Sequence, residues 1–342
     1  MSAAEHITQQ PSVAQSDLTF YLCGGTGINI GVALKERSPT KRAKLARFVG
    51  LDSSDANSSK NLFPVEGMYV AGSAEEKTTG SGKVKATNYG QSESFVTSVL
   101  SKHKPTKYNI VVCNTAGGTG SMLGTMVMRA LAKADQLFIL CVVHDMTSQT
   151  EMDNAVGTLR SMANQTSKGQ LDSAIPYLEF ENTLTNTRGE VNNNIVDRLN
   201  LATLFLNEGN GEMDYHDLKH LLNYSKHYKV PAALSRIRFI DNDGVSKFEG
   251  KTPVAVASLF SASDDVIPRF AGTVIRATGV FGEGTEKPGN VKEMHMVLDH
   301  GEALHELEAH MKALDDRKIE TSTKYVVQKD LSEGADGNGM FL

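Results

Sequence analysis

Two acidic residues and two glycine-rich segments have residue types and spacings that could do chemistry. Asp214 and Asp217, in "EMDYHDLKHLL", stand three residues apart, so a helix would present both carboxylates on one face. Such a pair can orient a water for attack on a phosphate. It can equally cap the helix, with Asp214 at the N-cap and Asp217 in the first turn. Because the glycine segments accompany the pair, we favour catalysis, and both roles can hold together.

The two glycine segments are "CGGTGINIG" (23–31) and "TAGGTGS" (115–121). Each follows an apolar run typical of a strand and precedes a stretch with helical spacing of apolar residues. A helix N-terminus that follows a parallel strand offers free N–H groups and a positive dipole end, which suits phosphate. One such segment is weak evidence, but two in one sheet favour a nucleotide site.

Neither standard phosphate motif fits. The stretch "EKTTGSGKV" has Lys77 and Val84 where the Walker A motif needs a glycine and a hydroxyl residue. In the first glycine segment, Gly31 comes one position too late for the dinucleotide fingerprint, although Asp52 lies near the place of the ribose-binding acid. A Rossmann-type NAD(P)-dependent oxidoreductase therefore remains the alternative, and it leaves "TAGGTGS" without a role.

The order of elements predicts an α/β fold. Up to about residue 185, strand-like and helical patterns alternate, which indicates a parallel sheet with helices on both faces. An apolar stripe then runs from Val191 to Leu206 and predicts a long central helix of about 18 residues, spanning roughly 27 Å. The segment "MDYHDLKHLLNYSKH" (213–227) predicts a further helix, and four strand-like runs after it predict a second, mixed sheet in an α+β domain. The segment "GEALHELEAHMKALDDRK" predicts a long helix after it.

Composition narrows the class of protein. The formal net charge is −5, which leaves no basic footprint for nucleic acid, and no apolar run approaches the roughly 20 residues of a membrane span. The first residues lack the basic and apolar parts of a signal peptide. Three cysteines in apolar runs predict buried free thiols in a reducing cytoplasm. No Cys/His cluster predicts zinc, and His216 and His220, four residues apart, are expected on a solvated helix face.

At this point the motifs match a known family. "AGGTGS" resembles the GGGTGT/S signature loop of the tubulin/FtsZ GTPase superfamily, with Ala116 at the first glycine position, and "GGTGINI" resembles that family's first phosphate loop. "EMDYHDLKHLL" is similar to the FtsZ N-V-D-x-x-D motif, with Glu212 in place of Asn. The resemblance covers most of residues 18–300. The polar N-terminal arm, terminal helix and acidic tail most resemble phage-encoded tubulins of the PhuZ type, with the plasmid-partitioning TubZ group as the nearest alternative.

The resemblance implies a nucleotide site, residue by residue. The α- and β-phosphates would lie against Gly24, Gly25, Thr26 and Asn29, and the metal-bound phosphates would lie near Asp52 and Asp55. The γ-phosphate would be sensed by Gly80, Ser81 and Gly82, and the signature loop that wraps the phosphates would be Gly117, Gly118, Thr119, Gly120 and Ser121. The guanine edge would meet Asn182 and one of Asn192, Asn193 and Asn194. The implied ligands are GTP or GDP with Mg²⁺. No protein side chain is assigned as a metal ligand, and the ribose loop (145–151) departs from the FtsZ pattern.

The resemblance also implies an organisation and a role. It predicts a flexible arm (1–16), a GTPase domain (17–188), a spine helix (189–208), a C-terminal activation domain (209–298), a terminal helix (299–324) and an acidic tail (325–342). Asp214 and Asp217 lie too far along the spine to reach their own nucleotide, so they would complete the neighbouring subunit's pocket. The expected protein is a GTP-hydrolysing filament that polymerises head to tail through its tail. It would position phage DNA in the host bacterial cytoplasm, with an adaptor or the phage particle as cargo, and it would contact neither nucleic acid nor membrane directly.

Overall fold

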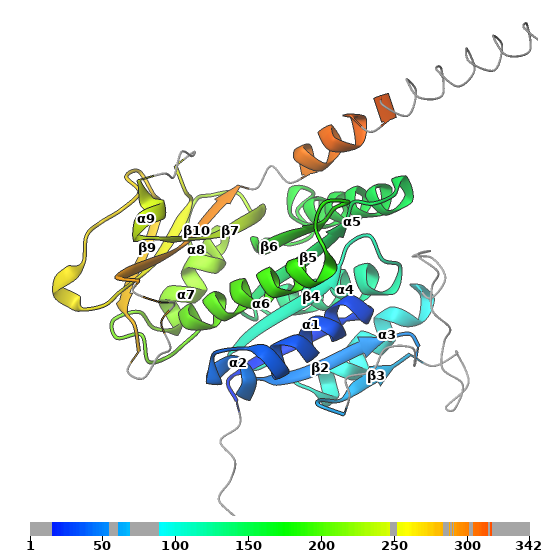
Figure 1. Ribbon diagram of the computed structural model, residues 1–342, viewed down its shortest axis with the longest axis horizontal. Coiled ribbons are helices and arrows are strands. Elements are labelled where there is room, and N and C mark those ends of the chain that lie inside the picture. The colour runs from blue at the N-terminus through cyan, green and yellow to red at the C-terminus, as the bar shows by residue number, and fades with distance from the viewer. Residues whose placement is uncertain are drawn as a thin grey trace, which may run out of the picture.

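The strands of the protein form one continuous sheet (Figure 1). The computed structural model describes residues 16–54, 61–68, 89–246, 252–282, 287, 289, 291–300, 304–313, 315 and 316. The strand order is β3-β2-β1-β4-β5-β6-β7-β10-β8-β9, and all neighbours are parallel except β10, which runs antiparallel to β7 and β8. The strands are β1 (Leu18–Cys23), β2 (Arg47–Asp52), β3 (Val65–Gly67), β4 (Tyr108–Asn114), β5 (Phe138–Asp145), β6 (Ile175–Asn182), β7 (Leu234–Asp241), β8 (Ala255–Phe260), β9 (Ile275–Val280) and β10 (Glu293–His300).

Helices cover both faces of this sheet, as expected for parallel strands joined by crossovers. Residues 304–313, which we call the C-terminal helix, follow β10. The other helices are α1 (Gly24–Arg37), α2 (Lys41–Leu45), α3 (Tyr89–Lys102), α4 (Thr119–Lys133), α5 (Gln149–Ser167), α6 (Arg188–Phe205), α7 (Tyr215–Leu222), α8 (Tyr224–His227) and α9 (Asn242–Val245), with a 3₁₀ turn at Ser263–Asp265.

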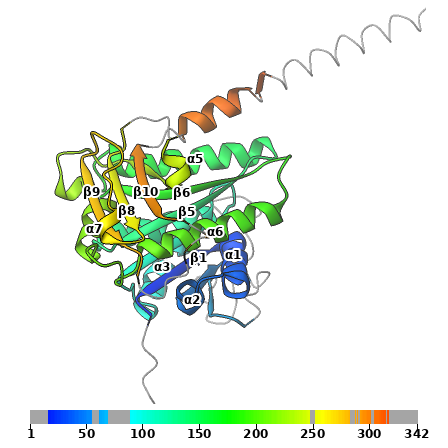
Figure 2. The ribbon, with the colours of Figure 1, turned by 60° about the vertical axis from the view of Figure 1, so that its left-hand side comes forward.

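Alternation along the strands divides the core into two layers. In β1, Phe20 and Leu22 pack with α1, α6 and α7 in one cluster, on what we call the spine face of the sheet. Tyr21 and Cys23 point the other way, into a cluster with α3, α4, α5 and Leu307 of the C-terminal helix. Figure 2 shows α6 and α1 on one side of the sheet, with α5 and the C-terminal helix on the other.

The spine helix is present as α6, which has 18 residues as predicted and ends at Phe205, three residues before the expected bound. It begins after Thr187, whose hydroxyl accepts a hydrogen bond from the Glu190 amide while the Glu190 carboxylate accepts one from the Thr187 amide. This reciprocal pair is a capping box. Val191, Ile195 and Leu199 are buried against the spine face, as their spacing predicted.

Three details differ from the sequence prediction. The mixed strands are not a second sheet, because β7 pairs with β6 from Ile175 to Tyr177 and carries the ladder across. The helix expected over residues 213–227 breaks into α7 and α8 at Asn223. The glycines at 24–27 do not form a loop before a helix, because α1 begins at Gly24. The proposed domain boundaries therefore stay a prediction, since both the sheet and the core cross them.

The three cysteines are free and fully buried, as predicted. Burial raises the pKa of Cys113 to about 12 and raises those of Cys23 and Cys141 well above the ordinary value. Among the residues that the structure describes, no helix has the length and apolar character needed to cross a bilayer.

Candidate functional site

The two glycine segments meet at the carboxyl edge of the sheet. β1 and β4 are adjacent and parallel, with Cys23 opposite Cys113, so the segments that follow them emerge side by side. Gly24 has φ +72°, and a Cβ placed on it would lie 2.7 Å from the Cα of Gly120. A Cβ on Gly120 would lie 2.9 Å from the Cys23 carbonyl oxygen. Both positions need glycine because the two backbones touch, and the contact brings the N-termini of α1 and α4 together.

Neither of these two helix N-termini carries an acidic residue in its first turn, which is also true of α2, α3 and α8. α5, α6 and α7 each carry an acidic residue in the first turn, namely Glu151, Glu190 and Asp217. α1 and α4 have instead basic residues in the last turn, namely Lys35 and Arg37 in α1 and Lys133 in α4. The first N–H groups of an α-helix have no partner within the helix. The two adjacent N-termini therefore offer unpaired amides and positive dipole ends to an external anion.

Asn114, which the sequence analysis did not single out, shapes the signature loop. Its Oδ1 accepts hydrogen bonds from the amides of Ala116 (2.8 Å) and Gly117 (3.2 Å). Its Nδ2 donates to Asp145 Oδ2 at 2.7 Å and lies 3.4 Å from Thr26 Oγ1 on α1. The only sequence signal for these roles was position, because Asn114 and Asp145 each end an apolar strand at the same edge of the sheet.

Asp145 carries this network to Asn182, a predicted base contact. Asn182 Nδ2 donates to Asp145 Oδ1 at 2.7 Å. Asn182 Oδ1 is buried and has no hydrogen-bond partner within the described part of the chain. An acceptor in this state fits a ligand edge made of N–H donors, and the guanine edge has two such groups. An unpaired buried acceptor is otherwise costly, at about 1–3 kcal/mol.

The structure separates the three candidate asparagines on the spine helix. Asn192 is half-buried on the side of α6 that faces the sheet, next to the core residues Val191 and Ile195. Asn193 is exposed, and its Oδ1 accepts a hydrogen bond from Arg37 at 3.3 Å. Asn194 is exposed and lines a cavity over β6 and β7. Of the three, Asn192 alone is neither exposed nor bonded to Arg37.

The residues of α1 fall into a ligand side and a core side. Gly25 and Thr26 are half-buried, and Asn29, one turn further on, is exposed on the same side of the helix. Gly31 faces the core instead, where a Cβ would meet Leu22 and Phe63. The late glycine that allowed a dinucleotide reading is therefore a packing glycine.

Asp52 ends β2 beside the start of α4, the helix that follows the signature loop. It is 3% exposed, and its Oδ1 accepts a hydrogen bond from the Ser53 amide at 2.7 Å. The Ser53 hydroxyl lies 2.7 Å from Thr119 Oγ1, at the start of α4. A buried carboxylate beside two anion-binding helix ends fits a site where Mg²⁺ accompanies phosphate. The other predicted residues of this group, Asp55 and Gly80–Gly82, lie outside the described residues, as do the arm up to residue 15 and the tail.

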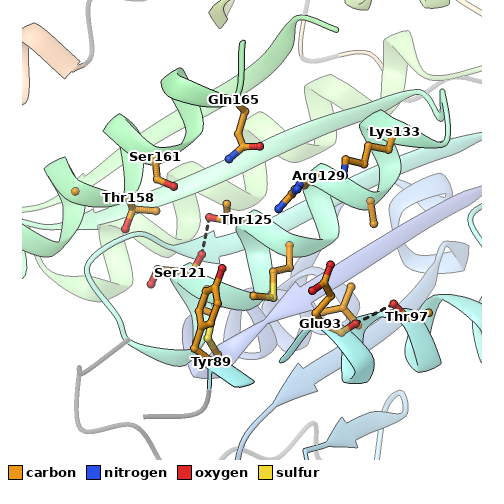
Figure 3. A pocket seen from close by; sticks show the side chains of 15 residues that line it. Tyr89, Glu93, Thr97, Ser121, Thr125, Arg129, Lys133, Thr158, Ser161 and Gln165 are labelled. Carbon is orange, nitrogen blue, oxygen red and sulfur yellow. Dashed lines mark hydrogen bonds between the residues drawn. The ribbon is translucent and has the colours of Figure 1, made fainter. Parts of the chain in front are cut away.

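The signature residues themselves are tightly packed. Gly118, Thr119, Gly120 and Ser121 are buried, and Gly117 is half-buried. Ser121 Oγ donates to the Gly117 carbonyl at 2.5 Å and lies 3.0 Å from that of Gly118. A cavity of about 300 Å³ lies behind this loop between α3, α4 and α5 (Figure 3). Ser121 and Thr158 line it, and all of its lining residues belong to α3, α4 and α5, the helices on the face opposite the spine.

The two catalytic candidates lie at the opposite edge of the sheet. Tyr215, between them in sequence, packs on Tyr108 with ring centroids 5.8 Å apart. Tyr108 begins β4 and Asn114 ends it, so the strand alone separates the acids from the signature loop by about 20 Å. Asp214 and Asp217 therefore cannot reach a phosphate held by their own chain.

The same two residues form a capping box, so they cap the N-terminus of α7 whether or not they take part in catalysis. Asp214 Oδ1 accepts from the amides of His216 (2.7 Å) and Asp217 (3.0 Å), and Asp217 Oδ2 accepts from the Asp214 amide (3.0 Å). The hydrogen bond from the Asp217 amide lowers the pKa of Asp214. Both residues are exposed, and these bonds use one oxygen of each carboxylate.

The histidines of this region do not form a metal site. His216 packs on Tyr215, and His220 stacks on His227 with ring centroids 4.0 Å apart. Within the described ranges no three His, Cys, Asp or Glu side chains come together as a metal would require.

The comparisons with known proteins agree with this geometry, although no protein-family model matches the chain. The chain is 24% identical over 262 residues to a phage tubulin-like protein of Pseudomonas phage PhiPA3, covering 76% of this chain and 78% of that protein. The solved structure "Protofilament of TubZ from Bacteriophage PhiKZ" matches with a TM-score of 0.73 at 19% identity, covering 90% of this chain and 92% of that one.

A second solved structure, "Structure of the phage tubulin PhuZ(SeMet)-GDP", also has a TM-score of 0.73, at 17% identity over 91% of this chain and 92% of that one. The sheet, the paired glycine segments and the spine helix occur in the chain in the order that the sequence resemblance predicted. The chain thus has the fold of the tubulin/FtsZ superfamily, and the proteins that it resembles in sequence are phage tubulin-like proteins.

Proposed function

We propose that the protein binds GTP with Mg²⁺ at the carboxyl edge of the sheet and hydrolyses it between adjacent subunits of a head-to-tail filament. One observation carries this proposal. The phosphate-binding helix ends and the acid pair occupy opposite edges of one sheet, about 20 Å apart along β4 alone. A molecule with half of its active site on each of two opposite ends can complete the site only by stacking on another copy.

This geometry also favours an open polymer over a closed dimer. A contact between two different surfaces is heterologous, and it repeats without closing unless a rotation brings the last copy back to the first. The related structures include a protofilament and a filament. Each added subunit would bring its acids to the nucleotide of the subunit before it, so assembly would switch hydrolysis on.

In the proposed site, the amides at the starts of α1 and α4 bind the phosphates, and Asn182 with Asn192 contacts the guanine edge. Asp52 and the bound Mg²⁺ offset the charge of the phosphate oxygens, which phosphoryl transfer requires. The neighbour's Asp214 and Asp217 each keep one carboxylate oxygen outside the capping box. A low pKa keeps Asp214 ionised, so that this oxygen can accept a hydrogen bond from the attacking water and orient it.

The experiment must separate catalysis from capping, and Asp217→Asn does so. A carboxamide oxygen can still accept the hydrogen bond from the Asp214 amide, so the cap survives while the charge is lost. We expect Asp217→Asn to fold and bind GTP normally, to lose at least about 100-fold in phosphate release, and to form filaments that persist. Asp217→Ala should lose the same activity plus about 1 kcal/mol of stability. Wild-type turnover in Asp217→Asn would show that the pair is a cap alone.

The tail and the cargo complete the proposal. Residues 325–342 are acidic and glycine-rich and end in Met340-Phe341-Leu342, a composition suited to a leash with an apolar plug. We propose that this tail docks on the neighbouring subunit and that the filament positions phage DNA, through an adaptor or the phage particle, in the host cytoplasm. Deleting 325–342 should abolish light scattering after GTP addition while leaving a folded monomer. Normal filaments from the truncated chain would refute the tail contact.

A further inference from the structure

A chain of polar side chains runs beneath α5 from the signature loop to the C-terminal helix. Thr115 begins the loop, and its Oγ1 lies 2.5 Å from Nδ1 of His144 on β5. His144 Nε2 lies 3.0 Å from Oε1 of Glu179 on β6. Glu179 Oε2 lies 2.6 Å from Nη2 of Arg236 on β7, and the same nitrogen donates to Oε2 of Glu306 at 2.7 Å. We call this the loop-to-helix network.

These side chains form a diagonal row on one face of the sheet, each two residues out of register with the next, because His144 lies opposite Glu181 and Arg236 lies opposite Tyr177. Neighbours of the same parity on β5, β6 and β7, such as Val142, Tyr177 and Leu234, belong to the core beneath α4 and α5. His144, Glu179 and Arg236 therefore cross that apolar layer from strand to strand. His144 is fully buried, and the side chains of Glu179 and Arg236 are 11% and 15% exposed.

A buried row of ionisable groups is not explained by stability alone. Replacing such groups by apolar residues is often neutral or stabilising, so they commonly serve to fix one arrangement. Here the row has one weak end. Glu306 is 58% exposed and belongs to a short helix held on the body by Leu307 in the core, by Leu304 and Met311 packed against that core, and by the pairing of Arg160 with Glu308.

We propose that His144, Glu179 and Arg236 act as positioning residues that couple docking of the C-terminal helix to the conformation of the signature loop. A single nitrogen of Arg236 is shared between Glu179 and Glu306. When the helix leaves, Arg236 turns wholly to Glu179 and alters the hold of Glu179 on His144, and His144 in turn sets the place of Thr115. Thermodynamic reciprocity requires that nucleotide at the loop then changes the docking of the helix.

A link between the filament contact and the nucleotide site would follow, and it rests on the proposed function, because we place the contact with the next subunit in the tail after this helix. A pull on the tail would reach the phosphate loop of the same chain through four hydrogen bonds. In this way the occupancy of the filament contact at one end of a subunit would be read at its nucleotide site.

The chain supplies a matched pair of variants. Glu306→Gln cuts the network at its exposed end. Glu308→Gln removes a charge two residues away on the same helix, and among the described residues no hydrogen bond links its ion pair with Arg160 to the loop. Both variants weaken docking by one ion pair, so a purely structural effect of undocking should be the same for the two.

The decisive measurement is hydrogen exchange on the nucleotide-free full-length chain. We expect Glu306→Gln to speed exchange of the amides at 115–118 by about 3- to 10-fold, with Glu308→Gln within error of wild type. Glu179→Gln should have an effect like that of Glu306→Gln, and the double variant should show no more than Glu179→Gln alone. Equal effects of Glu306→Gln and Glu308→Gln, or no effect of Glu306→Gln, would overturn the proposal, and this comparison decides even if Glu179→Gln fails to fold.

A second arm separates this proposal from the proposed function. GTP should change exchange in residues 304–313 of the wild type by about 3-fold or more and leave Glu306→Gln unchanged. If the chain bound no GTP, the proposed function would fail while the nucleotide-free comparison still decided the network. If GTP bound without any change at 304–313, the coupling would be wrong and the binding site would stand.

Discussion

Gly117 gives the sharpest test of whether the glycine segments exist to hold a ligand. A methyl group at Gly117 would lie 3.8 Å from the Asn114 carbonyl oxygen, an ordinary contact, and it would meet no other described atom within 4 Å. Gly117→Ala should therefore leave the free energy of unfolding unchanged or raise it by about 0.4–1 kcal/mol, since alanine restricts the unfolded chain. Gly24→Ala differs, because it combines a positive φ costing about 1–2 kcal/mol with a backbone clash costing about 1–3 kcal/mol.

Gly117→Ala, which should cost no stability, should nevertheless weaken the binding of GTP. If phosphate oxygens approach the loop at Gly117, the methyl group displaces them and removes charged hydrogen bonds worth about 1.5–3 kcal/mol. This loss corresponds to roughly a 10- to 150-fold weaker affinity for GTP. Urea denaturation and titration calorimetry on Gly117→Ala, Gly24→Ala and the exposed helical control Gly90→Ala would measure both quantities. A Gly117→Ala protein that binds GTP like wild type, or that unfolds as easily as Gly24→Ala, would refute the assignment.

Three further predictions concern buried groups. Cys23, Cys113 and Cys141 should resist labelling by iodoacetamide in the native protein, because burial raises their pKa values, and label fully in urea; fast native labelling would contradict the buried core. Burial lowers the pKa of His295 to about 4, so the unfolded chain takes up a proton that the folded chain refuses. Stability should accordingly be full above about pH 6.5 and fall as pH drops toward 4, less steeply in His295→Gln; equal slopes would place the pH dependence elsewhere. Asn182→Ala should reduce selectivity for GTP over ATP by about 10-fold in competition assays, and unchanged selectivity would exclude a role in base recognition.

Much of the fold was predictable because its signals are local and periodic. The continuous apolar run of β5 and the stripe from Val191 to Leu199 report burial directly, and the structure confirms both elements. The joining of β6 to β7 was not predictable, because no residue type marks which strand edges pair. The break at Asn223 was missed because the apolar spacing continues across it.

For the site, the glycine segments could be found because close backbone approach demands glycine. The roles of Asn114 and Asp145 could not, since their side chains meet only through the register of β4, β5 and β6. The same limit applies to His144 and Glu179, which are far apart in sequence and are brought together by the sheet. Which asparagine of the spine helix is half-buried likewise depended on the rotation of α6, which the three consecutive residues left open.

Each subunit is proposed to supply the nucleotide pocket of one active site and the acidic pair of another, so that no single subunit holds a complete active site. Phosphate release per protein molecule, measured across a hundredfold range of protein concentration at saturating GTP and Mg²⁺, tests it most directly. We predict a rate close to zero below a threshold concentration and a steep rise where light scattering reports filaments. A rate per molecule that stays constant through the threshold would mean that one chain hydrolyses GTP alone, and the shared-site account would be wrong.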